Sequence, residues 1–361
     1  MPSLFDPIDL TPKLSLPNRI LMAPLTRGRA TREAIPTPVM AEYYAQRAEA
    51  GLIISEATGI SREGLGWPSA PGIWNAAQVE GWKPVTEAVH ERGGRMVLQL
   101  WHMGRMVHSV VTGQQPLAPS AITPPGEAHS YDGKLPFEQP REATTDDISR
   151  VLDDYSRAAR NAIAAGFDGV QIHGANGYLI DEFLRSTSNH RSDEYGGPIA
   201  SRVRFLGEVA RRVVEEVGVE RVGVRLSPNG AVNGCDDPDH IALFSTIAAE
   251  LEKIGIPWIE LREPGPQSTF RATDQQPASP AMRRIFSGKI VLNSDYKLTS
   301  AQAKLNEGTA DAISFGRTFI ANPDLVERLK RDAALNRWDV DTFYTPGPKG
   351  YVDYPILDEA A

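Results

Sequence analysis

The stretch TDDISRVLDDYSRAARNAIAAGFDGVQIHGA, residues 145–175, holds one unit of a pattern that recurs along this chain. Its first part, 145–165, is amphipathic and rich in charge, and Gly166 follows where a left-handed residue commonly ends a helix. The apolar run at 169–175 then has the composition of a buried strand. We therefore expect a helix that leads directly into a strand.

Similar apolar runs alternate with helical segments almost from one end of the chain to the other. Strands are expected at 19–26, 52–60, 96–102, 169–175, 221–228, 258–264, 289–296 and 312–320. Helices are expected at 37–50, 76–92, 145–165, 199–217, 237–254, 280–286, 299–307 and 323–332. Continuous apolar strands that alternate with helices pair in parallel, so eight such units predict an α/β fold with a closed (β/α)8 barrel, the TIM barrel.

The alternative fold is an open, doubly wound sheet, which usually carries G-x-G-x-x-G after its first strand. Here the first strand runs into APLTRGRAT (23–31), which favours the barrel. Residues 103–144 are rich in Pro, Gly, Ser and His, and this long loop, inserted after strand three, is expected to lie over the top of the barrel. The aromatic tail at 343–355 is expected to fold back over the same face. No linker interrupts the chain, so we expect a single domain, 1–361.

The composition limits the possible classes of function. The 361 residues carry a net charge of −8, which argues against binding to nucleic acid or to an anionic membrane. The single cysteine, Cys235, excludes an internal disulfide and a cysteine-based metal cluster, and we expect no metal. The N-terminus lacks the features of a signal peptide, and no apolar run approaches the roughly 18 residues of a membrane helix. We therefore expect a cytoplasmic protein.

The active site of a barrel lies at the carboxyl ends of its strands, and in this chain those ends supply mainly hydrogen-bond donors. The motif SFGR at 314–317, followed by a helix, predicts that Gly316 and Arg317 bind a phosphate. The backbone around Asn293 and Ser294, at the end of the preceding strand, would supply further amides. The alternative is that Gly316 only turns the chain and Arg317 is solvated.

Two more strand ends carry polar residues that point to a ring-shaped ligand. Arg225 ends an apolar strand and would be costly to bury without an anionic partner. It either stabilises negative charge on an electron-poor ring or forms a salt bridge with Glu260 or Glu263. Gln99 offers a donor and an acceptor, which would match the edge of a pyrimidine-like ring.

The sequence HGANGY at 173–178 places several hydrogen-bonding residues at one strand end. If the chain coils into a helical turn there, His173 and Asn176 lie three positions apart and project from one face. Two neutral donors directed at one oxygen would form an oxyanion-type site, and Tyr178 could donate a proton to another atom of the same ligand. The alternative is a structural histidine with a core tyrosine.

Together these strand ends resemble the old yellow enzyme family of FMN-dependent ene-reductases, over nearly the whole chain from LFDPI (4–8) to GYVDYP (350–355). The chain looks closest to bacterial members that act on activated alkenes. Position 176 is Asn where many bacterial relatives have His, and position 26 is Thr where another subgroup has Cys. The motifs that carry the resemblance are NRILMAPLTRGRA (18–30), QLWHMGR (99–105), H-x-x-N-x-Y (173–178), FLRSTSNHRSDEYGG (183–197), VRLSP (224–228) and SFGR (314–317).

The resemblance implies a barrel that holds FMN without a covalent bond, with a role for each strand end. His173 and Asn176 would bind the electron-withdrawing oxygen of the substrate, and Tyr178 would protonate the carbon opposite the incoming hydride. Trp67, Trp101 and Tyr351 would shape the pocket over the flavin. The residues implied to bind the flavin ring are Pro24, Leu25, Thr26, Ala57, Gln99 and Arg225, and those implied to hold its phosphate are Asn293, Ser294, Gly316 and Arg317.

The resemblance also implies a ping-pong reaction, in which NADH or NADPH reduces the flavin and an α,β-unsaturated carbonyl or nitro compound then takes the hydride from flavin N5. We expect small molecules as the only partners and a monomer or homodimer. Three other functions are weighed against this one: a phosphosubstrate lyase on the same barrel, a glycosidase that uses Glu56 and Glu260, and a non-catalytic flavin-binding protein. The lyase would need a Schiff-base lysine or a metal cluster, and the binding protein would have no use for the His–Asn–Tyr group.

Overall fold

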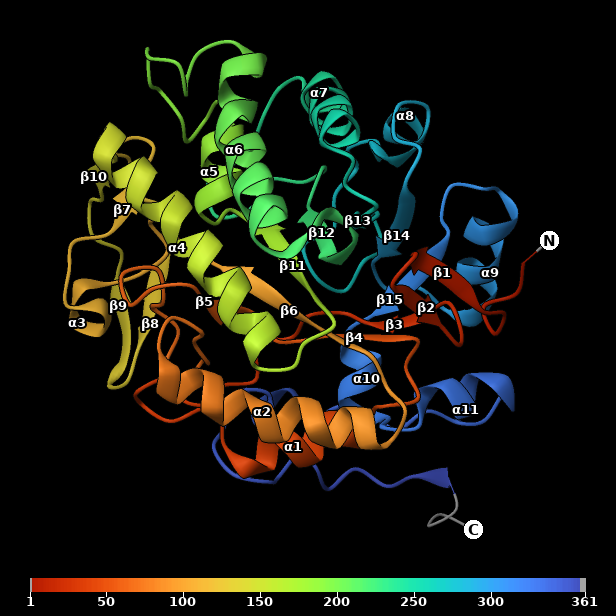
Figure 1. The fold of residues 1–361 in the computed structure, drawn as a ribbon. Coiled ribbons are helices and arrows are strands. Elements are labelled where there is room, and N and C mark those ends of the chain that lie inside the picture. The colour runs from red at the N-terminus through yellow and green to blue at the C-terminus, as the bar shows by residue number, and fades with distance from the viewer. Residues whose placement is uncertain (1, 358–361) are drawn as a thin grey trace.

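The computed structural model describes residues 2–357 and contains a parallel barrel of eight strands surrounded by helices (Figure 1). β11 pairs with both β6 and β12, and β15 pairs with β3, so the sheet closes on itself. The closed barrel predicted from the sequence is confirmed. In chain order its strands are β3 (Ile20–Met22), β4 (Leu52–Ile54), β6 (Met96–Trp101), β11 (Gly169–Gly174), β12 (Val222–Leu226), β13 (Trp258–Arg262), β14 (Lys289–Asn293) and β15 (Ala312–Phe315).

A helix follows each barrel strand and covers the outside of the sheet. For α4 the end signal read from the sequence is confirmed, because Gly166 follows the helix with φ +93°. The start of α4, a capping box of Thr144 and Asp147, was not read from the sequence. Among residues 2–357, no helix has both the length and the apolar character needed to cross a bilayer. The helices are α1 (Pro38–Ala45), α2 (Ala76–Glu91), α4 (Thr145–Ala164), α5 (Leu179–Leu184), α6 (Ile199–Val217), α7 (His240–Ile254), α8 (Ser279–Arg283), α9 (Leu298–Asn306), α10 (Arg317–Ala321) and α11 (Leu325–Lys330), with 3-10 turns at Val219–Arg221 and Val340–Thr342.

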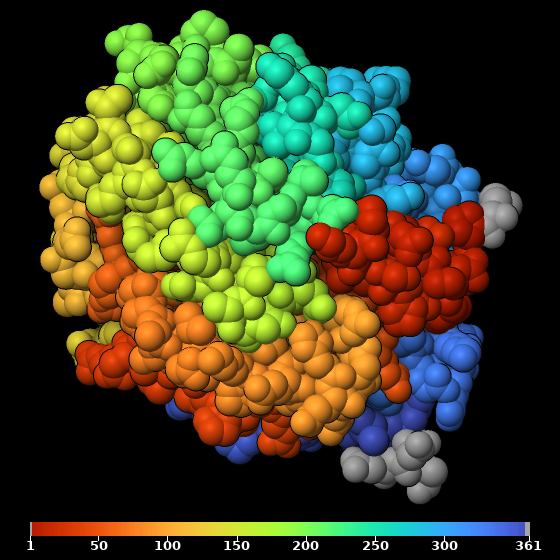
Figure 2. All heavy atoms as spheres, viewed as in Figure 1, coloured from red at the N-terminus to blue at the C-terminus, as the bar shows by residue number. Residues whose placement is uncertain are grey.

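Side chains alternate between the two faces of each barrel strand, and this separates the barrel interior from the helix-covered outside. Ile20 and Met22 belong to the main core, whereas Leu21 between them belongs to a second, smaller cluster. A hairpin of β1 (Ile8–Thr11) and β2 (Leu14–Leu16), which the sequence analysis did not anticipate, adds its apolar side chains to this second cluster. In Figure 2 the hairpin, in red, lies beside blue segments from the end of the chain.

The long loop at 103–144 contains short elements and no long helix, as expected. A four-residue helix, α3 (Ser109–Thr112), is followed by β7 (Leu117–Ala118), which pairs in parallel with β10 (Arg141–Glu142). Between them, β8 (Glu127–Ser130) and β9 (Gly133–Pro136) form an antiparallel hairpin. A two-residue strand, β5 (Thr58–Gly59), extends the sheet beside β6.

Candidate active site

A cavity of about 660 Å³ opens at the carboxyl ends of the barrel strands. Residues of the loop at 103–144 and of the tail at 343–355 form part of its wall, in agreement with the expectation that both segments lie over this face. The structure brings twelve of the predicted site residues together on the wall. These are Pro24, Leu25, Thr26, Trp67, Trp101, Asn176, Tyr178, Arg225, Asn293, Ser294, Gly316 and Arg317.

His173 lies directly behind this wall, near the end of β11, and is 4% exposed. Its ring meets the edge of Tyr178, with 5.2 Å between ring centroids, and lies nearly parallel to Trp101 at 6.4 Å. Burial, together with the positive charge of Arg225, lowers the pKa of His173 to about 3. The ring is therefore neutral near pH 7. Because its Nδ1 accepts the N–H of Ala175 (3.3 Å), the ring hydrogen is on Nε2.

The chain after His173 does not form the helical turn that the i, i+3 argument assumed. Asn176 and Gly177 both have left-handed backbones, with φ of +61° and +73°, and α5 begins only at Leu179. This tight turn, rather than a helix face, places the side chains of Asn176 and Tyr178 on the cavity wall. Asn176 and Tyr178 thus lie together as predicted, but a left-handed turn places them there and not the helical turn that we expected.

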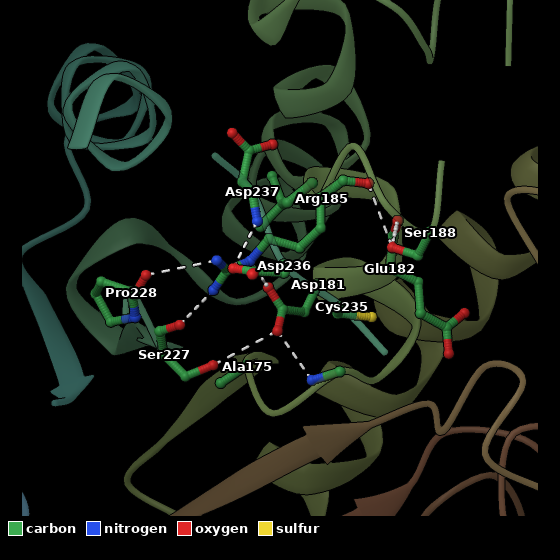
Figure 3. Close-up of polar contacts among 12 residues, drawn as sticks. Ala175, Asp181, Glu182, Arg185, Ser188, Ser227, Pro228, Cys235, Asp236 and Asp237 are labelled. Carbon is green, nitrogen blue, oxygen red and sulfur yellow. Dashed lines mark hydrogen bonds and ion pairs between the residues drawn. The ribbon is translucent and has the colours of Figure 1, made fainter. Parts of the chain in front are cut away.

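A buried network holds this left-handed turn (Figure 3). The N–H of Gly177 donates to Oδ2 of Asp181 (2.9 Å), and the N–H of Asn176 donates to Oγ of Ser227 (2.8 Å). Arg185 donates its Nε–H to Oδ1 of Asp181 (2.9 Å) and also donates to the carbonyl of Ser227. Asparagine is one of the few non-glycine residues that tolerate a left-handed backbone, and these bonds further stabilise Asn176 in that conformation.

Tyr178 and Trp101 form the apolar part of the wall next to His173. Their rings meet edge to face with centroids 5.0 Å apart. Burial raises the pKa of the Tyr178 phenol well above its usual value, so the phenol keeps its proton at physiological pH. The side-chain Oδ1 of Asn176 and the Nε1 of Trp101 are buried and have no hydrogen-bond partner among the described residues. Such groups are candidates for binding a ligand.

Polar side chains continue from the cavity into the interior of the barrel. Gln99 donates from Nε2 to Oε1 of Gln171 (2.7 Å), which in turn donates to Oε2 of Glu260 (2.8 Å). Glu260 is fully buried and is ion-paired with Arg225, whose Nη2 donates to Oδ1 of Asn293 (2.8 Å). The salt bridge to Glu260, one of the two alternatives for Arg225, is therefore formed, and Arg225 also lines the cavity.

Three further predicted residues are not on the cavity wall. Gln99 is 1% exposed and is engaged by Gln171, and Ala57 is 5% exposed in an apolar cluster with Trp101. Tyr351 is fully buried, stacks on Tyr43 with 4.0 Å between ring centroids, and does not reach the cavity. The expectation that Tyr351 shapes the pocket is therefore corrected.

A different tyrosine of the tail occupies the place expected for Tyr351. Tyr344 lines the cavity, and its ring centroid lies 5.0 Å from that of Trp67. The tail is fixed there by buried arginines, because Arg27 donates to the carbonyl of Gly350 (2.7 Å). Arg29 donates to the carbonyl of Thr342 (2.9 Å) and lies over the ring of Tyr351.

The end of the cavity near β14 and β15 is suited to an anion. A Cβ on Gly316 would meet only Leu25, at 3.5 Å, so contacts within the protein do not require a glycine there. The missing side chain leaves room for a ligand to approach the backbone. Arginines outnumber carboxylates on the wall: these charged residues are Arg225, Arg262, Arg271 and Arg317 against Glu127 and Asp295. A phosphate group fits this excess of positive charge.

Several residues of the wall were not identified from the sequence. Arg262 and Phe270 come from the end of β13 and the segment after it, and Met103 and Phe137 come from the loop after β6. A signal for Arg262 was available, because it stands two residues after Glu260 in a strand and hence faces the same, inward side. No comparable signal exists for the loop residues.

The carboxylates proposed for a glycosidase are engaged elsewhere. Glu56 is fully buried and accepts the backbone N–H groups of Arg27 (3.1 Å) and Gly28 (3.3 Å). Glu260 is held by Arg225 and Gln171 inside the barrel. Neither carboxylate is on the cavity wall, so the two do not face each other across a substrate site.

Comparisons with known proteins agree with this geometry. A model of the NADH:flavin oxidoreductase / NADH oxidase family matches residues 3–336. The chain is 42% identical over 354 residues to 12-oxophytodienoate reductase 1 of Oryza sativa subsp. japonica, covering 96% of this chain and 91% of that protein. It is similar to the solved structure of an old yellow enzyme homologue from Zymomonas mobilis, with 57% identity, a TM-score of 0.97, and coverage of 99% of this chain and 100% of that chain. Morphinone reductase in complex with tetrahydroNAD is also similar, at 45% identity and a TM-score of 0.93 over 100% of this chain and 99% of that chain.

Proposed function

The chain belongs to the NADH:flavin oxidoreductase / NADH oxidase family, and from this premise we propose that it reduces the activated C=C bond of α,β-unsaturated carbonyl or nitro compounds. It is an oxidoreductase of the old yellow enzyme type with FMN as cofactor. When bound, FMN would supply the hydride-transfer chemistry between NAD(P)H and the alkene. The protein binds and orients both partners and handles the proton.

The residues proposed to hold FMN line one side of the cavity. Thr26 and Arg225 would bind polar atoms of the ring, and Gly316 with Arg317 would hold the phosphate. Pro24, Leu25 and the backbone of Asn293 and Ser294 would complete the contact surface. Roles for Gln99 and Ala57 stay predictions, because Gln99 would first have to exchange its bond to Gln171 for one to the ring.

The observation that carries the proposal is the neutral His173 next to Asn176 and Tyr178. An imidazole with its hydrogen on Nε2 donates to a carbonyl or nitro oxygen without bringing a charge, and Asn176 would donate to the same oxygen. Both bonds draw electron density toward that oxygen and make the β-carbon electrophilic. They become stronger as negative charge develops on the oxygen, which is the requirement for catalysis.

Tyr178 is proposed to donate the proton that completes the reduction. Its phenol remains protonated because burial raises its pKa, and it stands on the cavity wall beside the oxygen-binding pair. A hydride on the β-carbon and a proton from the phenol on the α-carbon together saturate the bond. Solvent would then return a proton to the phenolate.

We further propose that NAD(P)H and the alkene use this one cavity in turn, which corresponds to a ping-pong mechanism. The open end at the strand ends is the access route that such alternation requires. A single domain over 1–361, a cytoplasmic location, the absence of nucleic-acid and membrane partners, and a monomer or homodimer remain predictions from the sequence.

The proposal is tested by following the visible absorbance of the bound flavin in the absence of oxygen. We expect NADH or NADPH to bleach the flavin band and 2-cyclohexenone to restore it within the time of a stopped-flow trace. Cyclohexanone, which lacks the C=C bond, is the matched control and should leave the flavin reduced. A flavin that is bleached but returns equally slowly with either compound would contradict alkene reduction and favour a flavin-binding protein.

A further inference from the structure

Arg262 is the last residue of β13 and points into the cavity end of the barrel. It faces Asn293 in the register of the neighbouring strand, next to residues proposed to hold the phosphate of FMN. Its side chain lines the cavity although the residue is only 7% exposed. The guanidinium is thus removed from bulk water but adjacent to the space that a ligand would fill.

The hydrogen-bonding capacity of Arg262 is not met by the protein. Its Nη2 donates to the carbonyl of Phe270 (3.1 Å), and the guanidinium lies 5.0 Å from the centroid of that ring. Its Nη1 is buried and has no hydrogen-bond partner among residues 2–357. A buried cation with an unused donor is unfavourable unless an anion binds to it.

The charges near Arg262 increase the free-energy cost of burying its charged guanidinium. Arg225, Arg271 and Arg317 are positive, and Asp295 is the opposing charge. Both the N–H and the hydroxyl of Thr269 donate to Oδ2 of Asp295, at 2.5 Å and 2.7 Å. Burial first and the neighbouring arginines second lower the pKa of Arg262 to about 10, which still leaves it charged near pH 7.

The other three arginines of the wall already have polar partners. Arg225 is paired with Glu260, and Arg317 donates to Oγ1 of Thr269 (3.0 Å). Arg271 is exposed and donates to Oδ1 of Asn233 (3.0 Å). Nη1 of Arg225 also makes no hydrogen bond, but it is ion-paired with Glu260, so among the described residues Arg262 is the buried arginine of this wall that has an unused donor and no carboxylate partner. It stands where a doubly charged group would supply the missing acceptor.

We infer that Arg262 is a phosphate-binding residue for FMN, acting with Gly316 and Arg317, and that it makes the protein select FMN over flavins that lack the phosphate. A planar guanidinium can donate two parallel bonds to phosphate oxygens, and such charge-assisted bonds are stronger than neutral ones. This inference rests on the placement of the phosphate in the proposed function.

The experiment measures dissociation constants of the apoprotein for FMN and for riboflavin, by quenching of flavin fluorescence. The readout is the ratio of the riboflavin constant to the FMN constant. In Arg262→Met we expect this ratio to fall by about 10- to 100-fold relative to the unsubstituted protein, since one charge-assisted bond to phosphate is lost. Riboflavin binding itself should change by less than about twofold.

Arg271→Met is the matched control, because it removes the same charge from the same cavity wall at an exposed residue that already has a partner. Its ratio should fall much less than that of Arg262→Met, because Arg271 contributes only screened charge to the wall and no unused buried donor. An equal fall in Arg271→Met would assign the preference to the general positive field and overturn the specific role of Arg262. If Arg262→Met weakens the binding of FMN and of riboflavin equally, Arg262 acts through packing. That result would also overturn its role in phosphate binding.

Two further arms complete the design. Arg262→Gln keeps a donor for the Phe270 carbonyl. If Arg262→Met does not fold, the ratio measured for Arg262→Gln tests the role of Arg262 in its place. Inorganic phosphate should compete with FMN, but not with riboflavin, more effectively in the unsubstituted protein than in Arg262→Gln. If the unsubstituted protein binds riboflavin as tightly as FMN, the placement of the phosphate fails. If it prefers FMN and both variants keep that preference, only the role of Arg262 fails.

Discussion

His173 shows how the environment of one residue sets the chemistry of the site. In water an imidazole is partly charged near neutral pH, but burial and Arg225 keep His173 neutral far below that range. The bond from Ala175 to Nδ1 then fixes the hydrogen on Nε2. The residue type is visible in the sequence, whereas its protonation state and tautomer result from the fold.

We call the two proposed donors to the substrate oxygen, His173 and Asn176, the clamp. This clamp predicts that substitutions at His173 and at Trp67 slow the reaction by different amounts. His173→Ala removes one donor to the substrate oxygen and is expected to slow alkene-dependent reoxidation of the flavin by on the order of 10²–10³. Trp67→Ala removes an apolar wall residue and should reduce the rate much less. Steady-state turnover and stopped-flow reoxidation measure both, and equal, small losses in the two variants would contradict the clamp.

Glu182 in α5 predicts a pH dependence of stability at the same scale. It is fully buried, its Oε1 accepts the N–H of Arg105 (2.9 Å), and burial raises its pKa to about 8. The folded state therefore binds this proton more tightly than the unfolded state. Between the pKa of Glu182 in the unfolded chain and pH 8, the free energy of unfolding therefore falls as pH rises. Glu182 contributes up to about 1.4 kcal/mol per pH unit to this fall.

Glu182→Gln removes this titration and keeps an acceptor for the Arg105 N–H. The free energy of unfolding of Glu182→Gln, relative to the unsubstituted protein, is expected to rise from pH 5 to pH 8 and then level off. Urea denaturation at a series of pH values measures this difference, in which other titrating groups cancel. A difference that does not change with pH would mean that Glu182 is ionised in the folded protein.

At the scale of elements, the turn between β11 and α5 is the part that converts a strand end into a site. Its two left-handed residues reverse the chain within a few positions, and Asp181 and Ser227 hold it from α5 and from the end of β12. The turn is thus tied to a neighbouring barrel strand. Movement of β12 would move Asn176 as well.

Gly177→Ala tests this turn. A Cβ there would lie 2.6 Å from the carbonyl oxygen of Val232 and 2.8 Å from Cβ of Asn233, so the turn must shift. We expect a loss of about 1–2 kcal/mol from the left-handed backbone alone, a further ~1–3 kcal/mol from the clash, and slower alkene reduction. Denaturation and stopped-flow kinetics measure the two effects.

Gly113→Ala is the control for this substitution. Gly113 also has a left-handed backbone, with φ +80°, but a Cβ there would meet nothing within 4 Å. It should therefore show only the smaller loss of stability and normal kinetics. Similar results for the two alanine variants would show that the Gly177 turn can shift without effect on the site.

At the scale of the whole molecule, one end of the barrel is closed by apolar packing and the other holds the cavity. At the amino end, the β1–β2 hairpin packs apolar side chains against the first residues of the strands. At the carboxyl end, long loops and the tail surround a polar cavity. Polar and apolar residues therefore separate along the barrel axis, and we expect substitutions at the amino end to change stability without changing the cavity.

Leu10→Ala in the hairpin tests this division. Leu10 is 2% exposed in the cluster that fills the amino end. Its truncation is expected to lower the free energy of unfolding by about 2–5 kcal/mol. The affinity for FMN, measured by fluorescence quenching under conditions where the variant is folded, should not change. Weaker FMN binding in the folded variant would show that the two ends are coupled.

The sequence was sufficient to predict the barrel and the end at which the cavity opens. Alternation of apolar strands and amphipathic helices is a local property, and parallel strands bring their carboxyl ends to one face. Each of the eight expected strand ranges contains one observed barrel strand. The N-terminal hairpin was missed because its short strands are stabilised by contacts with the barrel rather than by a strong pattern of their own.

Only the tertiary structure decided how the site residues are held. The hydrogen-bond partners of Asn176 and Gln99 lie 51 and 72 positions away in the sequence, and no local pattern specifies such distances. The same holds for the tail, where packing on Tyr43 buries Tyr351 and leaves Tyr344 on the wall. Residue types and periodicity are encoded locally, whereas burial, protonation and the choice among similar side chains depend on which distant segments meet.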